Sequence, residues 1–181
     1  MRRYVITGAP GAGKTTILAA LRNRGYPVVA EAATDVIARE QALGRAEPWH
    51  DEDFLDAITA LQRERQRRQP AATTSVQIFD RSPICTLALA HYSERPVPPL
   101  LAGEVARITE WVYEPRVFFV RLLGFITPTA ARRITLAQSI GFERIHERVY
   151  RDHGFDLIDV PAGAVEERVD LVDRHLRSWT D

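Results

Sequence analysis

The chain has 181 residues, of which 45% are hydrophobic and 27% charged, the balance of an ordinary globular protein. Lysine and arginine together number 24, as do aspartate and glutamate, so the formal net charge is zero. A protein that binds duplex nucleic acid usually has an excess of basic residues, so the charge balance argues against this function. The single cysteine excludes an internal disulfide and a cysteine-rich zinc site.

Hydrophobic periodicity predicts five short buried strands that alternate with helices. In chain order, the expected strands are 3–7, 26–30, 76–79, 117–120 and 155–160. The expected helices are 13–24, 33–43, from 51 or 53 to about 69, 82–91, 102–112, 137–153 and 164–179. Such alternation is typical of an α/β fold with a parallel sheet and helices on both faces, so we expect a single domain over 1–181. The segment 124–133 fits neither pattern, and we expect it to be a small mobile lid.

The most specific motif lies between the first expected strand and the first expected helix. Its residues match the phosphate-loop pattern G-x-x-x-x-G-K-[ST] and are Gly8, Ala9, Pro10, Gly11, Ala12, Gly13, Lys14 and Thr15. The glycines let backbone N–H groups turn inward around phosphate oxygens, and the helix N-terminus adds its positive dipole end. A glycine-rich turn that merely joins strand to helix is the alternative, and the complete motif in its strand–helix context argues against it.

We therefore expect the loop, together with Thr16, to bind the phosphates of ATP. Lys14 is the only lysine of the chain and is expected to reach the β- and γ-phosphates, while the Thr15 hydroxyl is expected to bind Mg²⁺.

Charged residues follow the second and third expected strands. Strand ends in this fold point into the ligand crevice, so Asp80 is a candidate Mg²⁺ ligand and Arg81 a candidate clamp for a substrate or phosphate oxygen. Alternatively, Asp80 caps the next helix and Arg81 is solvated. Glu31 is a candidate group to orient or deprotonate an acceptor hydroxyl, and its alternative role is to start the following helix.

Two arginines end the expected lid. A lid that brings Arg132 or Arg133 to the transferring phosphoryl group is a common device of small kinases, and the sequence leaves open which of the two enters the site. The alternative is a solvated basic start to the next helix.

The rest of the chain narrows the class of nucleotide-binding protein. A GTPase needs a lysine in its guanine-binding element, and the only lysine is already in the phosphate loop. A motor ATPase needs an Asp-Glu strand end and a further helical domain, for which 181 residues leave no room. We therefore expect a kinase that uses ATP and Mg²⁺ on a small hydroxyl compound, with a nucleoside as one candidate. The alternative is a regulatory switch ATPase with no small-molecule acceptor, in which Glu31 and Arg81 need not face one pocket.

A family resemblance rests on five segments. They are 6–16, Glu31-Ala32-Ala33, Phe79-Asp80-Arg81, 154–161 and 166–168. These segments are similar to the P-loop family grouped with the ribosylnicotinamide kinase domain of the bifunctional NAD regulator, whose members are often labelled AAA-family ATPases. The resemblance implies a nucleotide-kinase-like fold with strand order 2-3-1-4-5 and an arginine-bearing lid. Glu31 together with Asp80-Arg81-Ser82 also resembles the deoxynucleoside kinases, which use acidic residues at both places.

The expected location follows from what the chain lacks. It has no apolar run of the ~18 residues that a membrane span needs, and it starts without a signal-peptide pattern. We expect a cytoplasmic protein whose partners are a nucleotide and a small-molecule acceptor.

Overall fold

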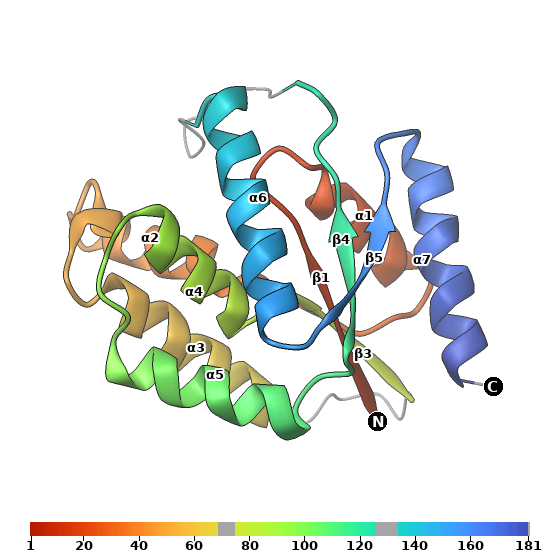
Figure 1. Cartoon of the computed structure of the whole chain (residues 1–181), viewed down its shortest axis with the longest axis horizontal. Helices are drawn as coiled ribbons and strands as arrows, with labels where there is room; N and C mark the ends of the chain where they lie inside the picture. The colour runs from red at the N-terminus through yellow and green to blue at the C-terminus, as the bar shows by residue number, and fades with distance from the viewer. Residues whose placement is uncertain (69–74, 126–133, 181) are drawn as a thin grey trace.

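A parallel five-stranded sheet forms the centre of the protein, as the computed structural model shows for the residues that it describes, 1–68, 75–125 and 134–180 (Figure 1). The strands are β1 (Arg2–Thr7), β2 (Val28–Val29), β3 (Val76–Asp80), β4 (Arg116–Val120) and β5 (Asp156–Val160). Their order in the sheet is β2-β3-β1-β4-β5. This confirms the expected α/β P-loop kinase fold and its strand order.

Helices follow the strands and cover both faces of the sheet. They are α1 (Lys14–Asn23), α2 (Ala32–Ala42), α3 (Phe54–Arg67), α4 (Pro83–Tyr92), α5 (Pro99–Trp111), α6 (Leu136–Asp152) and α7 (Val165–Thr180), with a short 3₁₀ turn at Pro48–His50. Helices α1 and α7 lie on one face, and α4, α5 and α6 lie on the other with α3 beside them (Figure 1). None of the helices in the described ranges is long and apolar enough to span a membrane.

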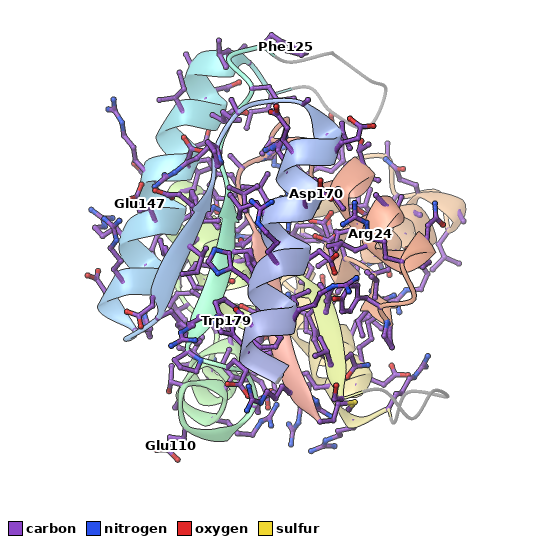
Figure 2. The ribbon with its side chains drawn as sticks, turned by 90° about the vertical axis from the view of Figure 1, so that its right-hand side faces the viewer. Arg24, Glu110, Phe125, Glu147, Asp170 and Trp179 are labelled. Carbon is purple, nitrogen blue, oxygen red and sulfur yellow. The ribbon has the colours of Figure 1, made fainter. Side chains whose placement is uncertain are left out.

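The two faces arise because successive strand residues point to opposite sides. On β1, Tyr4 and Ile6 join the core under α1 and α7, whereas Val5 joins the core under α4, α5 and α6. Figure 2 shows α7 in front of the sheet, with Trp179 near its end and Asp170 facing Arg24 of the neighbouring turn after α1. Asp170 and Arg24 form an ion pair of 2.5 Å there.

The ends of the elements differ from expectation by up to three residues, and the differences at β2 and α5 have a physical reason. The second strand was expected over 26–30, but only Val28 and Val29 pair with β3. Pro27 has no N–H to donate and β2 is an edge strand, so the regular pairing there is short. Helix α5 begins at Pro99, where a proline-rich loop was expected, because a proline in the first helical turn needs no N–H partner.

The parallel arrangement places the segments after β1, β2 and β3 close together, at the carboxyl ends of these strands. The phosphate loop and Glu31 lie in these segments, and Asp80 is the last residue of β3. The loop passes close to the end of β4, since a Cβ at Gly8 would lie 2.3 Å from the carbonyl oxygen of Val120. Gly8 also has a φ of 141°, so only glycine fits this position.

Candidate active site

The phosphate loop turns through three glycines with positive φ and leads directly into α1. These are Gly8, Gly11 and Gly13, with φ of 141°, 91° and 81°. The Lys14 side chain is buried, and its Nζ donates hydrogen bonds to Gly8 O at 2.9 Å and Ala9 O at 3.2 Å. The loop thus holds its own ammonium group in place.

Burial, and then the charge of Arg81, lower the pKa of Lys14 from 10.5 to about 8. The carboxylates of Glu31 and Asp80 act in the opposite direction. The charges of Arg81, Glu31 and Asp80 therefore all influence Lys14, as expected for side chains that share one small site.

Glu31 and Arg81 form an ion pair that joins the ends of β2 and β3. Arg81 Nε lies 2.6 Å from Glu31 Oε1, and Thr34 donates a hydrogen bond of 3.0 Å to the other carboxylate oxygen. The Arg81 side chain is only 11% exposed, so it is not the solvated arginine of the alternative interpretation. Burial tends to raise the pKa of Glu31, but the Arg81 and Lys14 charges outweigh it and lower the pKa overall. Glu31 is therefore held as a carboxylate that can accept a hydrogen bond.

Asp80 ends β3 and has an unusual environment. Its Oδ1 is buried and has no hydrogen-bond partner in the described structure. Burial and the nearby charge of Glu31 raise the pKa of this carboxyl group. Helix α4 takes Ser82 as its N-cap residue, so Asp80 is not the cap. An unpartnered buried carboxylate oxygen beside the phosphate loop fits the binding of a cation.

His146 of α6 also reaches the site, although no motif in the sequence singles it out. Its Nε2 lies 3.3 Å from Arg81 Nη1 and its Nδ1 3.3 Å from Phe142 O. Burial and the charges of Arg81 and Lys14 hold the pKa of His146 well below 6.5, so the ring is neutral. Because arginine only donates, Nε2 must accept from Arg81, and Nδ1 then carries the proton that is donated to Phe142. In the sequence, His146 can be recognised only as a polar residue on the face of α6 that is otherwise buried. The other buried residues of this face are Ser139, Phe142, Val149 and Tyr150.

Helix α6 makes further polar contacts with the elements of the site. Ser139 donates a hydrogen bond of 3.1 Å to Pro10 O in the phosphate loop. Tyr150 Oη lies 2.7 Å from Ser82 Oγ and 3.1 Å from Cys85 Sγ, and burial raises the pKa of this tyrosine. The helix therefore contacts both the loop and the start of α4.

The structure brings together only part of the predicted site. Lys14, Glu31, Asp80 and Arg81 interact, and Thr15 and Thr16 lie exposed in the first turn of α1. Arg132 and Arg133 lie outside the described residues, as does all of the expected lid except Gly124 and Phe125.

The glycine-rich loop between β1 and α1, the buried lysine and the strand order define a P-loop NTPase fold. The family model for an AAA domain matches residues 3–168, and the chain belongs to this family. No curated protein matches the chain.

Solved structures of deoxyadenosine kinase from M. mycoides have a similar fold. The structure with the products dCMP and a flexible dCDP is 17% identical with a TM-score of 0.59, and the alignment covers 97% of this chain and 99% of that one. The structures with dCTP and dATP, at the same coverage, are 18% and 14% identical with TM-scores of 0.55 and 0.52. At these identities the likeness concerns the fold.

Proposed function

We propose that the protein is an ATP-dependent kinase that phosphorylates a hydroxyl group of a small molecule, with a nucleoside as the acceptor. The observation that carries the proposal is the Glu31–Arg81 pair at the edge of the sheet next to the phosphate loop. A kinase needs a carboxylate that accepts the hydroxyl proton or orients the hydroxyl, and a cation that holds the acceptor or a phosphate oxygen. A switch ATPase needs neither group.

The phosphate side of the reaction uses the loop Gly8–Thr15, Thr16 and the buried ammonium of Lys14. Backbone N–H groups of the loop bind the phosphate oxygens, and Lys14 neutralises charge on the β- and γ-phosphates. Glu31, held ionised by its neighbours, accepts a hydrogen bond from the acceptor hydroxyl and aims its oxygen at the γ-phosphate. Outside the described residues, Arg132 or Arg133 is the proposed source of a further positive charge.

The oxygens present fit a magnesium ion. The buried Oδ1 of Asp80 has no hydrogen-bond partner in the described structure, and the Thr15 hydroxyl lies in the first turn of α1. Mg²⁺ in such enzymes is usually held by one or two protein oxygens and the substrate phosphates. When bound, the ion would neutralise charge on the phosphates.

A small cavity at the ends of β2 and β3 is the proposed acceptor site. It is lined by Val29, Gln62, Phe79, Asp80, Arg81 and Tyr113, among others. Apolar and aromatic walls with a few polar groups suit a flat ring with polar edges, as in a nucleoside. Arg65 also lines the cavity, and it donates a 2.8 Å hydrogen bond to Ala30 O and pairs with Asp35. Because the cavity is small, we expect these side chains to move when an acceptor enters.

Two kinds of nucleoside are the first acceptors to test. Three solved structures of similar fold are of a deoxyadenosine kinase, and the sequence motifs resemble ribosylnicotinamide kinase. Both names describe acceptors with a sugar hydroxyl, which is the chemistry that Glu31 would orient.

The test is incubation of the purified protein with ATP, Mg²⁺ and a panel of ribonucleosides, deoxynucleosides and ribosylnicotinamide, followed by mass spectrometry. Formation of a nucleoside monophosphate with equimolar ADP supports the kinase. ADP production at a rate that no acceptor changes would instead favour the switch ATPase. The variant Glu31→Gln should stop product formation, whereas Glu64→Gln, which alters a surface carboxylate paired with Arg68, should not.

A further inference from the structure

Arg168 of α7 is a buried cation that lies behind the phosphate loop. It is 3% exposed, and no carboxylate in the described part of the chain forms an ion pair with it. Its Nη2 donates hydrogen bonds to two backbone carbonyls, Ala12 O at 2.9 Å and Arg121 O at 3.1 Å. Its Nε is buried and has no hydrogen-bond partner in the same ranges. Burying a charge with so little compensation is unfavourable, so this arrangement calls for an explanation.

The two carbonyls that accept hydrogen bonds from Arg168 belong to different parts of the site. Ala12 is in the phosphate loop, and Arg121 immediately follows β4. The guanidinium therefore ties the loop to the end of β4, on the same side where Gly8 packs against Val120 O. It also lies so close to Gly13 that a Cβ there would be 3.0 Å from Nη1. The glycine of the motif and the arginine thus fit against each other.

The hydrogen bond to Ala12 O also has an electrostatic consequence. The Ala12 carbonyl and the Gly13 N–H belong to the same peptide group, and this N–H is part of the cradle that the motif forms around phosphate. A charge-assisted hydrogen bond to the carbonyl oxygen polarises the peptide and makes its N–H a stronger donor. The positive charge of Arg168 therefore acts on a bound anion through the loop.

We propose that Arg168 is a positioning residue of the phosphate loop, which fixes the Ala12–Gly13 peptide from behind and whose buried charge is balanced by the phosphates of the bound nucleotide. The proposal rests on the nucleotide-binding part of the proposed function and is independent of the acceptor. Lys14 and Arg168 would then act on the phosphates from two sides, Lys14 directly and Arg168 through the peptide.

The test compares Arg168→Met with Arg177→Met, which removes the same charge from the exposed side of the same helix, where Arg177 pairs with Asp173. Affinities for a non-hydrolysable ATP analogue and for inorganic tripolyphosphate are measured by titration calorimetry, and the melting temperature is measured with and without each ligand. Tripolyphosphate has no base or sugar, so it reports on the phosphate cradle alone. We expect Arg168→Met to bind both ligands at least tenfold more weakly, and Arg177→Met to bind as the wild type does.

The melting temperature separates positioning from general support of the fold. The stabilisation that tripolyphosphate adds to the melting temperature should be smaller in Arg168→Met than in the wild type, each compared with its own ligand-free protein. Arg168→Lys keeps the charge but cannot bridge the two carbonyls in the same way, and it should bind tripolyphosphate several-fold more weakly.

Distinct outcomes overturn the two proposals. If the wild type binds the ATP analogue and the Arg168 variants bind it equally well, or if Arg177→Met loses as much affinity, the role of Arg168 is wrong and the kinase proposal is untouched. If the wild type binds neither ligand, nucleotide binding itself is wrong, and the role of Arg168 is wrong with it. Should Arg168→Met fail to fold, unchanged tripolyphosphate affinity in Arg168→Lys overturns the proposal.

Discussion

Arg81 Nε lies 2.6 Å from Glu31 Oε1, so the ends of two neighbouring strands are joined by an ion pair beside the phosphate loop. Arg81 has a φ of 70°, a left-handed conformation that is rare for a residue with a side chain. Its N–H donates a 3.0 Å hydrogen bond to Ile6 O, and its guanidinium meets His146. Such strain is stable only when the surroundings fix it, and here it turns the side chain towards Glu31.

The first prediction concerns the Glu31 carboxylate. We expect Glu31→Gln to lower kcat by about 10²-fold or more while the affinity for ATP changes little, because the amide cannot take the acceptor proton. Steady-state kinetics with the identified acceptor and calorimetry with the ATP analogue measure the two effects. Normal turnover in the variant would reduce Glu31 to a helix-start residue.

The second prediction concerns the pH dependence of the reaction. The charges of Arg81 and Lys14 lower the pKa of Glu31, so this carboxylate stays ionised as the pH falls below the range of an ordinary glutamate. Arg81→Met removes the first of these charges and should move the acidic limb of the kcat/KM profile to higher pH. Arg68→Met, which removes an arginine that pairs with Glu64 at the surface, serves as the control. It should leave the acidic limb of the kcat/KM profile at the same pH as in the wild type. An unchanged limb in Arg81→Met would contradict the electrostatic coupling.

The third prediction concerns the stability of the fold in mild acid. His146 is neutral and buried with a pKa well below 6.5, whereas in the unfolded chain it titrates normally. Below pH 6.5 the unfolded state therefore binds more protons, and the free energy of unfolding falls as the pH falls, with a slope that approaches about 1.4 kcal/mol per unit.

The variant His146→Gln should lose this slope between pH 6.5 and 5. His50→Gln changes an exposed histidine and should keep the wild-type slope. Urea unfolding at each pH measures the free energies. Parallel pH curves for the wild type and His146→Gln would show that the buried ring does not titrate on unfolding as we infer.

The sequence predicts the fold because its signals are local. The phosphate loop is a contiguous motif between a strand and a helix, and the buried strands are short apolar runs such as Val117–Val120. The ends of elements are less predictable, since Pro99 looks like a loop residue until the helix that it starts is seen. The roles of Lys14 and Glu31 in the reaction stay predictions.

The contacts that the sequence did not reveal join residues far apart in the chain. His146 meets Arg81 across 65 positions, and Arg168 meets Ala12 across 156. Both lie on helices whose amphipathic pattern alone predicts packing and nothing more. Which side chain a buried polar residue meets depends on how the helix packs on the sheet, and no local pattern determines that.

The last prediction concerns proton uptake when ATP binds. In the free protein, burial and the Arg81 charge lower the pKa of Lys14 to about 8, so at pH 8.5 a substantial fraction of the protein carries a neutral Lys14. The phosphates of ATP favour the ammonium form and raise this pKa, so binding must take up a proton. We expect a substantial fraction of a proton per nucleotide at pH 8.5 and much less at pH 7, where more of Lys14 is already charged.

Calorimetry at each pH in two buffers of different ionisation enthalpy measures this uptake, because the protons come from the buffer. The nucleotide itself contributes little at pH 8.5, since the second pKa of a phosphate monoester is about 6. Arg81→Met tests whether the Arg81 charge causes the low pKa of Lys14. Without this charge the pKa of Lys14 in the nucleotide-free protein rises, so proton uptake at pH 8.5 should fall below the wild-type value. No proton uptake at either pH in the wild type would show that Lys14 is charged throughout and that its burial does not shift its pKa.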